Sequence, residues 1–508
     1  MEFTKDQQQV IDSRNQNIVV SAAAGSGKTA VLTERIARKI CSEAGKDTPI
    51  EELSHIERML IVTFTKAAAH EMRERIGKRL REELKSQPDN VHIRKQIAIL
   101  HTAQITTIDS FCLYIVRNHF EEIGLDPSFK IAMEEDTASL AQMAFDESIE
   151  NGFNTGTKSF LDLIESYAPK GNYGELQNIV KSLAGRANSK AYPLSWLDTL
   201  KLPENTNPEN LASMKFVEDY ENILLNSALD SAKVAKKLTE GTILIKHYEN
   251  AVLSIVFLEE LLNKGFAERT SKIRNLELTK LMYGAKKFTD EEKEVKDQAK
   301  ELLDYVKNTL DKLAKNFHEY EYEDEINYIK GSIYFANSLV DLTKEYLVRF
   351  EALKREANLI DFSDMEHLAL KILAKEENGE AIPTDTALKY REYFEEIMVD
   401  EYQDSNDIQE RLLSVISREN ADKPNRFMVG DVKQSIYRFR LADPKIFIEK
   451  NEIYAENRLA NSVRINLSKN FRSRKEVVDS VNAVFEKCML KEIAIVESKM
   501  RRIFNRDG

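Results

Sequence analysis

The chain has 508 residues, a formal net charge of −12 and 42% hydrophobic residues. A chain of this length is too long to fold around a single hydrophobic core, so we expect at least two domains. Its three cysteines form no Cys-x-x-Cys pair, which argues against a disulfide framework, a zinc site or an iron–sulfur cluster. No signal peptide pattern opens the chain, and no apolar stretch approaches a membrane span. We therefore expect a cytoplasmic protein without a membrane partner, in which any nucleic-acid site is a local track.

Short apolar runs in the first part of the chain predict buried strands. They are separated by helical patterns such as Ala30–Ile40 and Ala67–Leu80. This alternation is typical of a parallel sheet covered by helices. The predicted strands are Asn17–Ser21, Met59–Phe64 and Gln104–Ile108.

A phosphate-binding loop is indicated between the first strand and its helix. Gly25 and Gly27 allow the backbone N–H groups to wrap a triphosphate, Lys28 supplies positive charge, and the Thr29 hydroxyl suits magnesium. Ala22 stands where the usual pattern has glycine, which leaves a glycine-rich surface loop as the alternative, but the strand and helix on either side disfavour it. We expect Lys28 to be an exposed residue. The predicted nucleotide-binding residues are Ala22, Ala23, Ala24, Gly25, Ser26, Gly27, Lys28 and Thr29.

Residues 120–388 form a charged block that is poor in turn residues and has helical periodicity. Apolar residues recur there at steps of three and four, which predicts an amphipathic helix. A coiled coil is the alternative, but the stripe is short and favours a helix within a helical subdomain. The stripe consists of Val295, Ala299, Leu302, Val306, Leu310, Leu313 and Phe317.

The α/β rhythm resumes after this block. We predict strands at Phe394–Val399, Arg426–Val429 and Val463–Leu467, each followed by polar residues and then a helix. Strands of the same kind on both sides of the helical block indicate one parallel sheet that is interrupted by an insertion.

An acidic pair, Asp400 and Glu401, follows the first of these strands. In a nucleotide hydrolase a carboxylate at this place holds magnesium and the next one polarises the attacking water, so we assign these roles to Asp400 and Glu401. Acidic clusters are more often solvated loops, but the upstream phosphate loop disfavours that alternative here.

A third cluster, Gly430–Arg440, follows the next strand. Gln434 offers an amide for a phosphate, and Tyr437 and Phe439 alternate with arginines in a pattern that suits stacking on bases and pairing with a nucleic-acid backbone. The alternative is an amphipathic helix whose aromatic side chains belong to the core.

Taken in order, these segments resemble the motifs of the UvrD/Rep/PcrA/RecB helicase superfamily. The set also includes Thr63–Met72 and Asn470–Ser473. Within the superfamily, Phe3–Gln7, Thr107–Cys112 and Ile360–Leu368 look most like the AddA (RexA) family of ATP-dependent helicase/nuclease subunits. The resemblance implies a RecA-like P-loop NTPase fold with a parallel sheet and a large all-helical insertion subdomain.

The resemblance also implies roles for single residues. Gln7 is expected to read adenine and Phe471 to stack on it, while Gln434 and Arg472 sense the terminal phosphate. Arginine follows the phosphate-loop threonine in some relatives, but Ala30 stands there in this chain, which puts adenine packing from that side in doubt. The residues expected to contact single-stranded DNA are Thr63, Phe64, Thr65, Thr107, Tyr437 and Phe439.

The implied activity is that of a 3′–5′ DNA helicase and nuclease for double-strand-break repair by homologous recombination, with ATP, Mg²⁺, single- and double-stranded DNA and an AddB/RexB-type partner subunit. Residues 1–119 and 389–490 are expected to form the motor domain, 120–388 the insertion and 491–508 a truncated or irregular tail. The chain stops before the second motor domain and the nuclease domain of this family, so we expect ATP binding with little translocation. The alternatives are a helicase without nuclease activity and a nucleotide-switched DNA-binding scaffold.

Overall fold

The computed structural model describes residues 2–42, 53–203, 206–207, 212–274, 288–419, 421–437, 441–456, 458–459 and 461–488. The chain divides into two compact units. The first, which we call the sheet unit, comprises Met1–Thr155, Lys170–Asp198 and Leu342–Gly508. The second, the helical unit, comprises Gly156–Pro169 and Thr199–Asp341. The boundaries 1–119, 120–388 and 389–490 remain a prediction.

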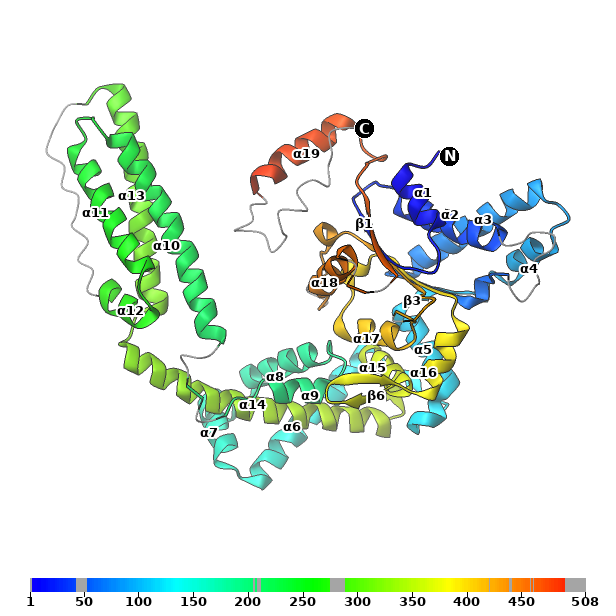
Figure 1. The fold of residues 1–508 in the computed structure, drawn as a ribbon. Helices are drawn as coiled ribbons and strands as arrows, with labels where there is room; N and C mark the ends of the chain where they lie inside the picture. The colour runs from blue at the N-terminus through cyan, green and yellow to red at the C-terminus, as the bar shows by residue number, and fades with distance from the viewer. Residues whose placement is uncertain are drawn as a thin grey trace. The chain divides into compact units, whose positions relative to one another are not determined.

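A parallel sheet forms the centre of the sheet unit and is covered by helices (Figure 1). It has six strands in the order β10-β1-β9-β8-β2-β3. Strands from both sides of the inserted block pair with one another in it, as β1 does with β9 and β10 and β2 with β8, so the predicted interrupted parallel sheet is confirmed. The strands begin and end within two residues of their predicted positions. Their bounds are β1 (Asn17–Ala22), β2 (Met59–Thr63), β3 (Gln104–Thr107), β8 (Glu396–Val399), β9 (Arg426–Gly430) and β10 (Ser462–Leu467).

Two hydrophobic cores lie on opposite faces of this sheet because successive side chains of a strand point to opposite faces. Ile18 and Val20 of β1 belong to the core that includes Ile36 and Met72, whereas Val19 belongs to the core that includes Phe111. The first core packs α1 (Lys5–Asp12), α2 (Lys28–Ser42), α3 (Lys66–Ser86) and α4 (Val91–Ile99). The second packs α5 (Ile108–His119), α15 (Phe362–Leu373), α16 (Asp385–Tyr393), α17 (Asp407–Val415) and α18 (Pro444–Ala455).

Further helices and short strands complete the sheet unit. They include α6 (Glu134–Thr155), α8 (Gly174–Ala187), α9 (Pro193–Thr199) and α19 (Lys475–Cys488), while α14 (Tyr322–Glu356) runs through both units. Two-stranded sheets pair β4 (Lys130–Ile131) with β5 (Leu359–Ile360) and β6 (Ala374–Glu377) with β7 (Glu380–Pro383). The predicted insertion 120–388 therefore contains short strands in addition to its helices.

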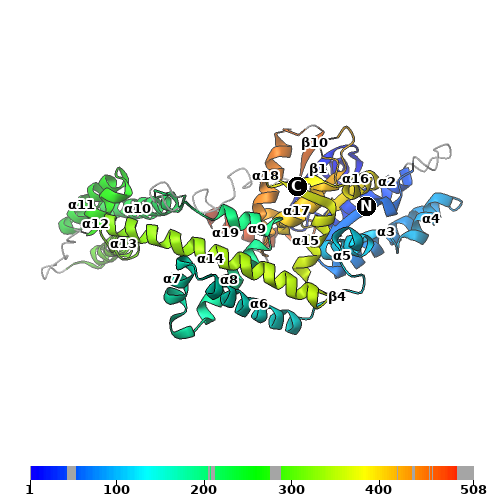
Figure 2. The same ribbon diagram turned by 90° about the horizontal axis from the view of Figure 1, so that it is seen from below.

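The helical unit is built on α10 (Ala212–Thr239), α11 (Ile245–Leu262) and α13 (Asp290–Phe317), which lie side by side (Figures 1 and 2). The unit also contains α12 (Phe266–Arg274), which contacts α13, and α7 (Lys158–Tyr167). The predicted apolar stripe lies on α13, where Val306, Leu310 and Leu313 pack against Leu225 and Leu229 of α10. The stripe thus belongs to the core of a helical unit. None of the helices in the described ranges is both long and apolar enough to cross a bilayer.

Candidate functional site

The phosphate loop connects the end of β1 to the start of α2, as predicted. Gly25 and Gly27 have φ angles of 72° and 84°, in the left-handed region that favours glycine. A Cβ atom on Gly25 would lie 2.7 Å from Asn470 Oδ1, and one on Gly27 would lie 3.2 Å from Gln7 Nε2. Side chains at either glycine would therefore strain the backbone and crowd the loop.

The segment Asn470–Ser473 lies against the phosphate loop. Asn470 Nδ2 donates to the Ala24 carbonyl at 2.9 Å, and the Phe471 N–H donates to the Gly25 carbonyl at 2.8 Å. The Phe471 side chain is 61% exposed, and Arg472 is also exposed. The structure thus brings these two predicted residues beside the loop while leaving their side chains accessible, as ligand-binding groups require.

Gln7 is a buried residue at the N-terminal turn of α1. Its Oε1 accepts from the Thr4 N–H at 2.9 Å in a capping box, and its Nε2 donates to the Ser26 carbonyl at 3.0 Å. Gln7 therefore anchors α1 to the phosphate loop. Each end of an amide has capacity for one more hydrogen bond, so a contact with adenine stays a prediction.

Lys28 and Glu401 form an ion pair across the site. Lys28 Nζ donates to both Oε1 and Oε2 of Glu401 at 2.9 Å. The Lys28 side chain is only 13% exposed, so the expectation of an exposed lysine is wrong: the carboxylate at the end of β8 faces the start of α2 and covers it. Glu401 itself has φ 50° and ψ 44°, a sparsely populated conformation for a residue other than glycine, and such conformations cluster at active sites.

Asp400 is poorly solvated for a carboxylate. Burial, together with the neighbouring Glu401 carboxylate, raises the pKa of Asp400 to about 6, although Lys28 acts in the opposite direction. The same two causes raise the pKa of Asp404 to about 6. Thr29 follows Lys28, whose ammonium contacts Glu401, so the Thr29 hydroxyl and the Asp400 carboxylate are oxygen donors of the kind that Mg²⁺ prefers. The donor set therefore fits Mg²⁺.

The phosphate loop also fits a polyanion. The Ser26 Oγ is buried without a hydrogen-bond partner, Lys28 points toward the acidic pair, and the two left-handed glycines bend the backbone around the start of α2. Helix N-termini attract anions through their unpaired N–H groups. Ala22 and Ala23 are buried beneath this loop, whereas Ala24 is exposed.

Gln434 lies in the short 3₁₀-helix η7 (Val432–Gln434), directly after β9. Its Nε2 donates to Asp431 Oδ2 at 2.8 Å, and Lys433 Nζ donates to Asp431 Oδ1 at 2.6 Å. The sequence reasoning missed another amide, Gln403, which joins Glu401 to the backbone of Asp431. No local signal identifies it, because one of its partners comes from a different strand.

The predicted DNA-contacting residues gather at the carboxyl ends of β2 and β3. The rings of Phe64 and Tyr437 are in contact, with centroids 4.4 Å apart and an interplanar angle of 31°. Thr65 and Thr107 cap the N-termini of α3 and α5, and the Thr63 hydroxyl donates to the Thr65 carbonyl at 3.0 Å. Phe439 lies outside the described residues.

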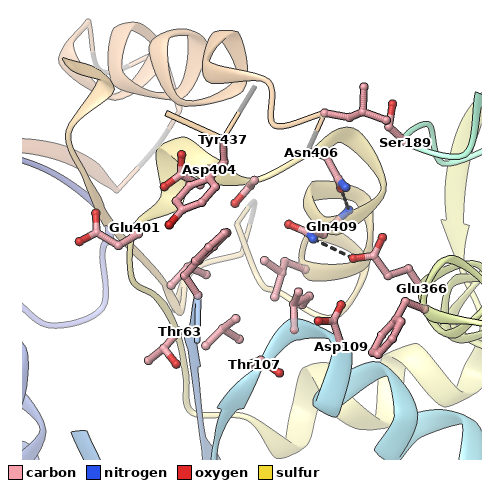
Figure 3. Close-up of a pocket in the computed structure, with 18 of the residues that line it drawn as sticks. Thr63, Thr107, Asp109, Ser189, Glu366, Glu401, Asp404, Asn406, Gln409 and Tyr437 are labelled. Atoms are coloured by element: carbon pink, nitrogen blue, oxygen red, sulfur yellow. Dashed lines mark hydrogen bonds between the residues drawn. The ribbon is translucent and has the colours of Figure 1, made fainter. Parts of the chain in front are cut away.

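A cavity of about 500 Å³ opens beside this cluster, and Phe64 and Tyr437 line it together with Glu401 (Figure 3). Glu366 lies at its wall and accepts from Gln409 Nε2 at 2.7 Å. Burial raises the pKa of Glu366 to about 7 despite this hydrogen bond. The aromatic pair and the catalytic carboxylate candidates thus share one cavity.

Comparison with known proteins agrees with this geometry. The chain matches the family model of the UvrD/REP helicase N-terminal domain over residues 3–306 and 242–455. It is 43% identical over 97% of its length to an ATP-dependent helicase/nuclease subunit of Lachnoclostridium phytofermentans, and covers 36% of that protein. The protein of the same name from Clostridioides difficile is 37% identical, with 97% of this chain and 39% of the relative covered. The protein of the same name from Thermoanaerobacter sp. is 40% identical, with 97% of this chain and 40% of the relative covered.

These matches confirm the resemblance that the ordered motifs indicated, both to the helicase superfamily and to its helicase/nuclease subunits. The chain spans about 36% to 40% of the length of these relatives. The matched residues include the phosphate loop, the acidic pair after β8 and the cluster after β9. The chain belongs to the UvrD/REP helicase family.

Proposed function

We propose that this chain carries the first ATP-binding motor domain of a 3′–5′ DNA helicase and nuclease subunit that acts in double-strand-break repair by homologous recombination. The proposal rests on the contacts of the phosphate loop at the carboxyl end of β1. Lys28 of this loop pairs with Glu401, and the Asn470–Arg472 segment is hydrogen-bonded to the loop backbone. The curated relatives, which are named as ATP-dependent helicase/nuclease subunits, support the same activity.

In the proposed site the phosphate loop and Lys28 hold the triphosphate, with Gln7 and Phe471 at the base. Lys28 leaves Glu401 to contact the phosphates, which frees the Glu401 carboxylate to accept a proton from the attacking water. Gln434 and Arg472 sense the terminal phosphate. Thr29 and Asp400 would hold Mg²⁺, which neutralises charge on the phosphates when it is bound.

DNA is proposed to pass over the carboxyl ends of β2 and β3. Phe64 and Tyr437 present aromatic rings on which bases of any sequence stack, and Thr63, Thr65 and Thr107 lie beside them. Phe439 belongs to the same proposed track. Sequence-tolerant stacking suits a motor that moves along single-stranded DNA and separates double-stranded DNA.

Further parts of the proposal concern the whole protein. The word subunit in the names of the relatives supports assembly with a second chain, which we propose to be of the AddB/RexB type. The proposed substrates are single- and double-stranded DNA, and the proposed location of the activity is the cytoplasm. Exonuclease activity is proposed for the full-length protein.

The test is ATP hydrolysis by the full-length protein with and without a single-stranded oligonucleotide, followed by strand separation. We expect DNA to stimulate hydrolysis and a duplex with a 3′ overhang to be unwound in preference to one with a 5′ overhang. A rate of ATP hydrolysis that DNA does not change would favour the alternative of a nucleotide-switched DNA-binding scaffold. Unwinding from the 5′ overhang would contradict the proposed polarity.

A further inference from the structure

Gln403 is a buried amide next to the proposed catalytic carboxylate. It lies in the 3₁₀-helix η6 (Tyr402–Asp404), and its side chain is 1% exposed. Its Nε2 donates to Glu401 Oε2 at 2.9 Å and to Asp404 Oδ2 at 3.1 Å. An amide nitrogen has two hydrogens, so Gln403 can donate to both carboxylates at the same time.

The other end of this amide reaches the next strand of the sheet. Gln403 Oε1 accepts from the Asp431 N–H at 2.9 Å, and Asp431 directly follows β9. The Asp431 carboxylate in turn accepts from Gln434 Nε2. A single side chain therefore links the carboxylate after β8 to the segment after β9.

The backbone around Gln403 leaves no spare room. A Cβ atom on Gly430 would collide with Gln403 Oε1 and would lie 3.2 Å from the Gln403 backbone nitrogen. The amide is thus clamped between the end of β9 and the Glu401 turn, and a shift of either one must move the other.

The different charges of the two donors to Glu401 indicate what the Gln403 link does. Glu401 has two donors, Lys28 and Gln403, and binding of a triphosphate would draw the lysine away. Gln403 is neutral, so its hydrogen bond orients the Glu401 carboxylate and opposes proton transfer to it less than the charged Lys28 does. Its hydrogen bond also lowers the pKa of Asp404, against the effects of burial and of Glu401.

Gln403 is hydrogen-bonded to the backbone of Asp431, and the segment 431–437 ends at Tyr437, whose ring contacts Phe64 in the proposed DNA track. We propose that Gln403 is a positioning residue that holds the Glu401 carboxylate and transmits to it the shift that DNA causes in residues 431–437. This inference rests on the proposed function, since it needs DNA at Phe64 and Tyr437.

The first experiment compares ATP hydrolysis by the full-length wild type and Gln403→Leu, each with and without saturating single-stranded oligonucleotide. We expect the DNA-stimulated kcat to fall by about tenfold or more, while the KM for ATP stays within about twofold, because the amide acts on the carboxylate and not on the nucleotide. The rate without DNA changes less, so the stimulation ratio falls toward one.

The matched control is Gln96→Leu. Gln96 is also a fully buried glutamine with both amide ends engaged, since its Oε1 accepts from the Ile56 N–H and its Nε2 contacts His55. It lies away from the site, so it reports the effect of losing a buried amide on folding alone. The stimulation ratio of this variant is expected to stay at the wild-type value.

A second pair of variants tests the contact by stability. Gly430→Ala is expected to lower the unfolding midpoint of the chain, and to lower it less when Gln403→Ala has already removed the amide, because the collision is with Gln403 Oε1. A cost of Gly430→Ala that is independent of residue 403 would overturn the clamp.

The outcomes separate the two proposals. A stimulation ratio that Gln403→Leu leaves unchanged, in a wild type that responds to DNA, would overturn the role of Gln403 and leave the proposed function standing. A wild type that hydrolyses ATP without any response to DNA would refute the proposed function, and the coupling inferred for Gln403 would fail with it.

Discussion

Lys28 and Glu401 are 373 positions apart in the chain, and the lysine ammonium donates to both oxygens of the carboxylate at 2.9 Å. The pair joins the phosphate loop after β1 to the acidic pair after β8. The proposed role of each partner requires that the ion pair breaks, because Lys28 has to contact the phosphates and Glu401 has to accept a proton from water. Nucleotide binding and release of the catalytic carboxylate are therefore one event in the proposed mechanism.

Lys28→Met is expected to weaken ATP binding by about tenfold or more, because the change removes the charge that the phosphates need and keeps the aliphatic stem. The measurement is a titration with a fluorescent ATP analogue. Lys39→Met is the matched control: Lys39 is on the same helix, is also 13% exposed and pairs with Glu396 at 2.9 Å. Unchanged ATP affinity in Lys28→Met would contradict the phosphate-loop assignment.

Glu401→Gln is expected to lower turnover about 10²- to 10⁴-fold, the usual contribution of a general base, without weakening ATP binding. The substitution keeps the shape of the side chain and removes its negative charge, so Lys28 becomes freer to meet the phosphates. Single-turnover hydrolysis and nucleotide affinity in the full-length protein measure the two effects. Near-normal hydrolysis would mean that another group activates the water.

Phe64→Ala and Tyr437→Ala are each expected to weaken binding of single-stranded DNA by about 1–3 kcal/mol, the range for loss of one base stack. The double variant should lose less than the sum of the two, because the rings contact one another. Fluorescence anisotropy with a labelled oligonucleotide measures this. Tyr328→Ala, which removes a ring from the Tyr320–Tyr328 pair of the helical unit, serves as the control.

Glu366 makes stability depend on pH. Its folded-state pKa of about 7 exceeds the ordinary value of 4.5, so its contribution to stability is fully present below about pH 4.5 and is lost as the pH rises through 7. Gln409 and Asp109 face this carboxyl group. Glu366→Gln cannot titrate, so between pH 5 and pH 8 it should gain about 2–3 kcal/mol in unfolding free energy relative to the wild type.

Denaturant unfolding of both proteins at the two pH values measures this gain. Asp400 and Asp404 also have raised pKa values, but both are common to the two proteins and their effects cancel in the comparison. A difference between wild type and Glu366→Gln that stays constant with pH would show that Glu366 is ionised throughout the range.

The sequence by itself determined the elements and the kind of site. Each strand of the six-stranded sheet was predicted to within two residues, since strands buried on both faces, such as β1 and β8, are apolar along their length and this signal is local. The phosphate loop was readable for a similar reason, because Gly25 and Gly27 supply conformations that other residues avoid. The short strands β4 to β7, which lie in the expected all-helical insertion, were not predicted.

Only the tertiary structure decided which of these groups meet. The pairing of Lys28 with Glu401 and the bridge from Gln403 to Asp431 depend on the order of strands in the sheet, which places β9 between β1 and β8. The burial of Lys28 arises in the same way, from the distant Glu401 carboxylate, whereas the pKa of Asp400 is raised by burial and by its sequence neighbour Glu401 and is lowered by the distant Lys28. Periodicity and propensity report each residue's near neighbours along the chain, whereas desolvation and hydrogen bonding act between neighbours in space.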